Sequence, residues 1–199
     1  YTCTDTLSLH DALPISLIYL VEHLSGLVSV TNLVSHFTSQ KRKTSYDTIA
    51  NYISYLEDVF LIHRVERCQV RTKEVVLGTC RYYINDWAFM HYLYPFFVRE
   101  REVKFRNHVC LELKHAGYRV NVGVHRNKVI DFMARKDDRI IYIQCVSTLE
   151  NEVAMQASYA SLESIQDNYE KWVVSLDKTM LPSKEGIRHI QAWKLAEML

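Results

Sequence analysis

Apolar positions in the first half of the chain recur first at helical and then at strand spacing. Apolar residues three or four positions apart predict three helices, over residues 17–24, 32–39 and 46–59. Two later segments, 61–70 and 81–85, are rich in β-branched and aromatic residues and flank a polar loop, which predicts two strands. Three short helices followed by a two-stranded ribbon are typical of a winged helix-turn-helix domain.

The second half of the chain predicts a different set of elements. A helix over residues 104–116 ends at Gly117, and the order that follows is three strands, a helix and two strands. The predicted strands occupy residues 118–124, 128–135, 139–147, 171–176 and 186–192, and the later helix occupies residues 150–166. We therefore expect an α+β or α/β chain with two domains.

Two features of the sequence mark the borders of the first domain. A short aromatic helix over residues 86–94 stops at a proline, so we place the domains at residues 17–95 and 96–199. Residues 1–16 have neither an initiator Met nor the pattern of a signal peptide, and they resemble the translation of a sequencing adapter. We expect this stretch to be an artefactual or disordered arm, and the chain to be a fragment of a longer protein.

Composition and charge narrow the class of protein. The chain has 24 Lys and Arg against 23 Asp and Glu, a formal net charge of +1, so any contact with nucleic acid must come from a local patch. Hydrophobic residues make up 48%, with only five Gly and three Pro, which is enough to bury a core. No apolar run approaches the roughly 18 residues that a membrane span needs. The five cysteines are far apart and form no CxxC pair, so we expect reduced thiols in a soluble, cytoplasmic protein without structural zinc.

The register of one predicted hairpin can be derived from its turn. If Asp137 and Asp138 form a two-residue turn, Asp131 lies directly opposite Gln144, and Val129 lies opposite Val146 on the same face of the sheet. The opposite face would then carry four apolar positions: Phe132, Ile143, Ile130 and Cys145. A half-buried carboxylate is costly unless a donor, a cation or a metal satisfies it, so Asp131 is a candidate site residue.

A local cluster of cations precedes and follows the third helix. Candidate nucleic-acid-binding residues are those on the turn before this helix, on its exposed face and on the loop between the two predicted strands: Lys41, Arg42, Lys43, Tyr46, Asn51, Arg71 and Lys73. The alternative is a solvated or protein-docking face. Acidic residues on the same helix argue against strong binding of DNA at physiological salt.

The carboxylates and their spacing resemble a known family. Glu112 on a helix, Asp131 on a hairpin and the triplet Gln144-Cys145-Val146 resemble the PD-(D/E)XK nuclease fold. The strings VIDFMARKDDRIIYIQ and DNYEKWVVSLD resemble the C-terminal domain of unknown function of bacterial and archaeal AAA-type ATPases. This resemblance implies an ATPase module that binds ATP upstream of this chain, then a winged helix, then a restriction-endonuclease-like αβββαβ domain. The chain itself has no glycine-rich phosphate loop.

The resemblance also assigns roles to single residues. Glu112 and Asp131 would hold Mg²⁺, Gln144 would take the first position of the triplet, and Val146 stands where an active nuclease has Lys. Lys128 or Lys114 could replace that Lys only by reaching the site from another position in the sequence. The alternation of side chains along a strand places Lys128 on the face of the sheet opposite Asp131.

We therefore expect a vestigial site in a non-catalytic regulatory or targeting module, whose partners are its own ATPase module, DNA or an unidentified protein. Two alternatives stay open: a Mg²⁺-dependent DNA endonuclease using Glu112 and Asp131, and a winged-helix DNA-binding module. Asp131 could also be satisfied structurally, and Glu112 could form only a surface pair with His108.

Overall fold

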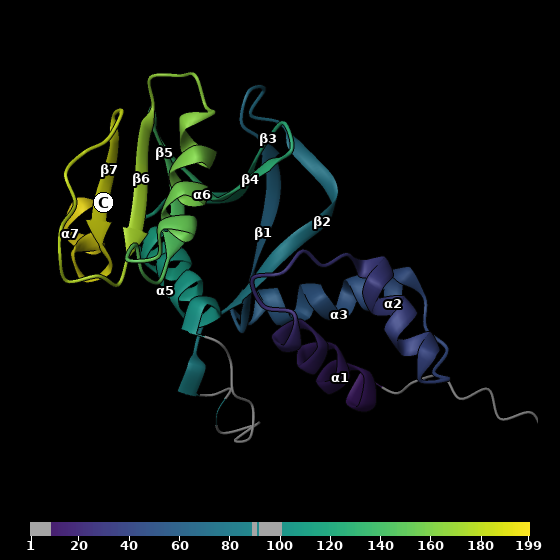
Figure 1. Cartoon of the computed structure of the whole chain (residues 1–199). Coiled ribbons are helices and arrows are strands. Elements are labelled where there is room, and N and C mark those ends of the chain that lie inside the picture. The colour runs from purple at the N-terminus through teal and green to yellow at the C-terminus, as the bar shows by residue number, and fades with distance from the viewer. Residues whose placement is uncertain (1–8, 89–90, 92–100) are drawn as a thin grey trace, which may run out of the picture. The chain divides into compact units, whose positions relative to one another are not determined.

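The computed structural model describes residues 9–88, 91 and 101–199 (Figure 1). The chain divides into two compact units, one formed by residues 1–65 and 77–97 and the other by residues 66–76 and 98–199. The boundary expected at residues 94–101 and most of the helix expected over residues 86–94 lie outside the described residues.

The first unit contains the three expected helices and most of a hairpin. Its elements are α1 (Leu9–Glu22), α2 (Val30–Ser39), α3 (Tyr46–Asp58), β1 (Ile62–Gln69) and β2 (Val75–Ile84). Ser29 caps α2 and Ser45 caps α3. The hydroxyl oxygen of each accepts a hydrogen bond, at 3.1 Å, from the backbone N–H of the residue three positions later. The expected element order is therefore confirmed in this unit.

Two expectations about the first unit are wrong in detail. Helix α1 begins at Leu9, eight residues before the expected start, so residues 9–16 are helical and are not a disordered arm. Phe60 continues the apolar spacing of Ile49, Ile53 and Leu56, which predicts it on the inward stripe of the third helix, but it is 68% exposed. Phe60 follows the end of α3 and has a φ of 56°. This left-handed conformation turns Phe60 away from the buried face of the helix, to which Ile49 and Ile53 belong.

The second unit contains the remaining elements in the expected order. They are α5 (Arg101–His115), β3 (Arg119–His125), β4 (Lys128–Lys136), β5 (Arg139–Val146), α6 (Glu152–Glu163), β6 (Glu170–Ser175) and β7 (Ile187–Gln191), followed by a short 3-10 turn (Ala192–Lys194) and α7 (Leu195–Met198). Gly117, two residues after the last residue of α5, has a φ of +84°, which confirms it as the helix stop.

The strands form a mixed sheet in the order β2-β1-β3-β4-β5-β6-β7. Strand β1 joins the second unit at Arg67–Gln69, which pair in parallel with Val122–Val124. Strands β3, β4 and β5 are antiparallel neighbours, whereas β5, β6 and β7 are parallel. The carboxyl ends of these three parallel strands therefore lie at one edge of the sheet, where ligands commonly bind in sheets of this kind.

Helices cover both faces of this sheet (Figure 1). Helix α6 packs on the face that carries Met133, Tyr142 and Val173, which share one buried cluster with Tyr159 and Leu162 of the helix. Helix α5 contacts β3, β4 and β5 from the other face. Both faces of the central strands are apolar for this reason. No helix within the described part of the chain is long and apolar enough to cross a membrane.

Candidate functional site

Asp131 lies at an irregularity in the sheet. The expected hairpin register is confirmed from Lys136–Arg139 to Phe132–Ile143, but the ladder between β4 and β5 ends there, one pair before Asp131 and Gln144. On the other side of β4, Asn121 pairs with Met133 whereas Gly123 pairs with Ile130, so β4 has one more residue than β3 across this step. This is a β-bulge at Asp131–Phe132, a feature that re-aims side chains.

The bulge also corrects the expected distribution of side chains between the two faces. Ile130 was expected beside Phe132, with Val129 and Val146 on the face of Asp131. Instead, Ile130 and Val146 both belong to the buried cluster under α6, and Val129 is 36% exposed. The simple two-residue alternation fails because the extra residue shifts the faces within β4.

Side-chain hydrogen bonds replace the missing ladder at Asp131. The carboxylate, whose residue is 3% exposed, accepts the backbone N–H of Cys145 through Oδ2 at 3.1 Å. The backbone N–H of Asp131 donates to Oε1 of Gln144 at 3.3 Å. Asp131 and Gln144 are therefore neighbours, as expected, although through side chain and backbone and not as a ladder pair.

A cation from α5 lies against the Asp131 carboxylate. Nε of Arg106 is 3.4 Å from Oδ1 of Asp131, and Nη2 of Arg106 is 3.8 Å from Oε2 of Glu102. Glu102 also accepts the backbone N–H of Ser147 through Oε1 at 3.0 Å. A chain of charges thus runs from the bulge across α5 to the loop that follows β5.

Glu112 takes another position. Its carboxylate is 3.9 Å from Nδ1 of His108, one turn earlier on α5. It follows Arg106 by six residues, so it projects about 120° away around the helix. The structure therefore places Glu112 in the surface pair and puts Arg106 and Glu102, which we did not single out from the sequence, beside Asp131. Within the described ranges, no group of three His, Cys, Asp or Glu side chains is placed to hold a metal.

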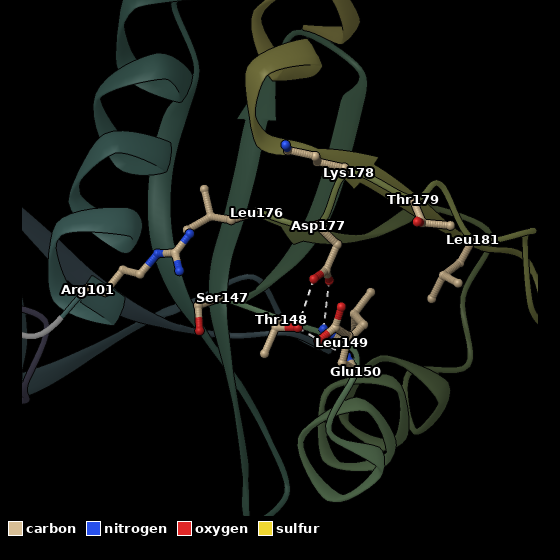
Figure 2. A pocket seen from close by; sticks show the side chains of 10 residues that line it. All are labelled: Arg101, Ser147, Thr148, Leu149, Glu150, Leu176, Asp177, Lys178, Thr179 and Leu181. Atoms are coloured by element: carbon tan, nitrogen blue, oxygen red, sulfur yellow. Dashed lines mark hydrogen bonds between the residues drawn. The ribbon is translucent and has the colours of Figure 1, made fainter.

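The charged chain reaches a hollow at the carboxyl ends of β5 and β6. This hollow has a volume of about 680 Å³ and is lined by the loops after these two strands and by Arg101 of α5 (Figure 2). Ser147, whose N–H is bound by Glu102, is one of its lining residues. Lys178 supplies a second cation to the lining.

Asp177 ties the two loops of this hollow together. Its Oδ1 accepts the hydroxyl of Thr148 at 2.8 Å, and its Oδ2 accepts the N–H of Leu149 at 2.7 Å (Figure 2). Oδ2 also accepts the hydroxyl of Ser175 at 2.8 Å. Burial raises the pKa of this carboxyl, but these donors outweigh burial and leave the pKa below its usual value. Asp177 is therefore an ionised clamp between the loops.

His189 forms further hydrogen bonds that hold the same loop after β6. It is 1% exposed, and its Nδ1 accepts the N–H of Leu181 at 3.0 Å. Its Nε2 is 2.9 Å from the hydroxyl of Ser175, so the hydrogen-bond pattern assigns the ring proton to Nε2. Burial lowers the pKa of His189, although Asp177 opposes the shift. Because both ring nitrogens are bound and Ser175 donates to Asp177, this trio holds the loops and is not arranged as a catalytic triad.

The seven candidate nucleic-acid-binding residues fall into both units. Five belong to the first unit, where Lys41, Arg42 and Lys43 are exposed on the turn before α3, as are Tyr46 and Asn51 on the helix. Arg71 and Lys73 belong to the second unit, because the tip of the β1–β2 hairpin groups with it. Lys128, considered as a substitute for the nuclease lysine, instead donates to the backbone oxygen of Ala160 in α6 at 2.7 Å.

Comparison with known proteins gives two similarities. Residues 9–100 match a domain of unknown function, DUF8612. The chain is 28% identical over 159 residues to an uncharacterized protein of Haemophilus influenzae, an alignment that covers 80% of this chain and 39% of that protein. No solved structure matches the chain significantly. This chain thus resembles about two fifths of a longer relative, and its match to the domain of unknown function begins at the first residue of α1.

Proposed function

We propose that this chain is a non-catalytic regulatory or targeting part of a longer AAA-type ATP-binding protein. ATP would bind to a module outside this chain. In this proposal the second unit descends from a PD-(D/E)XK nuclease-like domain, and the first unit serves as a winged-helix-like unit for contact with DNA or a protein partner. The longer Haemophilus influenzae relative supports a protein of greater length.

The observation that carries the proposal is the position of the Arg106 guanidinium beside the carboxylate of Asp131. Metal-dependent phosphodiester hydrolysis needs anionic oxygens that are open to Mg²⁺ and water. Here one oxygen of Asp131 accepts a backbone N–H and the other faces the guanidinium of Arg106. Arg106 thus supplies the positive charge that a metal would bring, but a guanidinium has no open coordination position for an attacking water.

The position of the missing lysine supports the same conclusion. Val146 is 8% exposed and packs in the cluster under α6 with Tyr142 and Met133. A valine there neither donates a hydrogen bond nor carries charge, and Lys128 is bound to the backbone of α6. In this proposal the Asp131 site has a structural role. Its hydrogen bonds and ion pairs hold the bulge, α5 and the loop after β5 together.

The test is an incubation of the purified chain with supercoiled plasmid and Mg²⁺ or Mn²⁺. We expect no nicking above that of the Asp131→Asn variant. Metal-dependent nicking that disappears in Asp131→Asn would contradict the proposal and support a DNA endonuclease instead. The coding sequence upstream of this chain provides a separate test, since we expect it to encode a phosphate-binding loop of the form GxxxxGK[ST].

A second candidate function, DNA binding through the first unit, rests on the exposed face at the start of α3. Tyr46 is 57% exposed there, directly after the cationic turn. We expect any affinity for duplex DNA to fall steeply with salt, because phosphate contacts release counterions. Fluorescence anisotropy with the Lys41→Glu/Arg42→Glu variant tests this candidate: unchanged affinity would show that the turn is not the contact.

The compartment proposed for this protein is the cytoplasm. Cys68, Cys80, Cys110 and Cys145 are all buried and free, as in proteins that fold under reducing conditions.

A further inference from the structure

A second hollow of the same unit lies away from Asp131. It has a volume of about 720 Å³ and is built by three segments that are distant in sequence. These segments are the tip of the β1–β2 hairpin, the β3–β4 turn and the loop between α6 and β6. Pockets for small ligands commonly measure about 300–1,000 Å³, so this one has room for a molecule of nucleotide size.

One partly buried interaction connects the segments that build this hollow. Nζ of Lys73 is 3.7 Å from Oδ2 of Asp167, forms a hydrogen bond with the hydroxyl of Tyr142, and lies 4.9 Å and 5.0 Å from the ring centres of Tyr142 and Tyr169. The hydroxyl of Tyr142 also donates to Oδ2 of Asp167 at 2.7 Å. Burial lowers the pKa of Lys73, although Asp167 opposes this. The hairpin tip is therefore tied to the α6–β6 loop before any ligand binds.

The other charged side chains of the lining are cationic and form no ion pair within the described part of the chain. Asp167 is the acidic residue of the lining and is already paired with Lys73, whereas Arg71 and Arg126 form no salt bridge within the described part of the chain. Nε2 of His125 is buried in the same lining without a hydrogen-bond partner among the described residues. Two guanidinium groups and an imidazole nitrogen without a hydrogen-bond partner among the described residues thus belong to the lining, and its one carboxylate is paired with Lys73.

The β3–β4 turn presents one of these cations in a costly conformation. Arg126 follows His125 in a two-residue turn and has a φ of 53°, a value that Gly or Asn adopts more readily than Arg. A left-handed conformation is unfavourable for such a residue, because its Cβ approaches the following carbonyl oxygen. The turn therefore places a long cationic side chain in the lining at a position where a small residue would be more stable.

We propose that this hollow binds a phosphorylated ligand of nucleotide size, with its phosphate between Arg71 and Arg126 and its base on the exposed side of Tyr169. Guanidinium groups bind phosphate oxygens with paired hydrogen bonds. Nε2 of His125 adds a donor when it carries the ring proton. Tyr169 is 42% exposed, which leaves ring surface for stacking beside the face that Lys73 covers. This site goes beyond the function proposed above and uses none of the residues around Asp131.

Isothermal titration calorimetry of the whole chain tests the proposal with three probes: AMP, inorganic phosphate and a single-stranded oligonucleotide without terminal phosphates. We expect AMP to bind in the micromolar range and inorganic phosphate to bind about tenfold more weakly, because phosphate lacks the stacking contact. We expect Arg71→Gln/Arg126→Gln to weaken AMP binding by about tenfold or more.

A matched control separates the pocket from overall charge. Arg119 and Lys194 are exposed and lie outside the lining, so Arg119→Gln/Lys194→Gln removes the same two charges elsewhere. We expect this control to bind AMP as the unaltered chain does, and Tyr169→Leu to weaken AMP but not inorganic phosphate. No AMP binding, equal loss in the two double variants, or binding of the oligonucleotide alone would each overturn the proposal.

Discussion

Removal of the guanidinium of Arg106 is the most informative perturbation of the Asp131 site. In Arg106→Met the carboxylate of Asp131 keeps the Cys145 N–H but loses the opposite charge 3.4 Å away. Breaking a fully buried ion pair costs about 3–5 kcal/mol. The side chain of Arg106 is 27% exposed, so water screens part of this charge, and we expect a smaller loss of about 2 kcal/mol in the free energy of unfolding.

A double-mutant cycle measures the same interaction without the cost of a stranded charge. Asp131→Asn keeps an oxygen that can accept the Cys145 N–H, and the double variant Arg106→Met/Asp131→Asn contains neither charge. We expect the second substitution to cost less in the Arg106→Met background than alone, with a coupling of about 1–2 kcal/mol. The assay is urea unfolding followed by circular dichroism, with Arg119→Met as the exposed control, which should change stability by less than about 0.5 kcal/mol.

An Arg106→Met variant as stable as the control would contradict this prediction. Additive effects of the two substitutions would contradict it too, because independent sites show no coupling. Either result would mean that the guanidinium does not neutralise Asp131.

The remaining predictions concern the loops and the bulge. The pKa of His189 is lowered on folding, so below pH ~6.5 the unfolded chain takes up a proton that the folded chain does not. Stability should therefore be complete above that pH and fall as the pH drops through the folded pKa of His189, with a further loss below pH ~4 from the lowered pKa of Asp177. Urea unfolding between pH 8 and pH 5 checks the first step, which should be missing in His189→Gln; a stability independent of pH in the unaltered chain would refute it. Gly123→Ala should cost about 1–3 kcal/mol, because a Cβ there would lie 2.9 Å from Cβ of Ile130. The same assay would disprove this steric account if Gly123→Ala were as stable as the unaltered chain.

The hairpin shows how far the sequence predicts the site. A two-residue turn determines the register of the residues next to it, and the predicted pairs are confirmed as far as Phe132 and Ile143. The bulge depends on β3, a separate strand, and on the carboxylate of Asp131 taking a backbone N–H that a ladder partner would otherwise use. No pattern within the hairpin itself contains that information.

Helix α5 shows a second limit. Phe105, Val109 and Leu113 are spaced four residues apart, which predicts one apolar stripe on this helix, and all three are buried. It determines which face of the helix meets the sheet, but Arg106 and Glu112 lie on opposite flanks of that face. Which of the two meets Asp131 is set by packing between elements. The clue in the sequence was the pair Glu102 and Arg106 at i, i+4 on the first turns of the helix.

The most direct test of the central claim is a titration of the whole chain with Mn²⁺, followed by calorimetry, at neutral pH. If Arg106 occupies the place of a metal beside Asp131, no Mn²⁺ should bind with a dissociation constant below the millimolar range, and Asp131→Asn should behave identically. Binding of one Mn²⁺ per chain that is lost in Asp131→Asn would contradict the account.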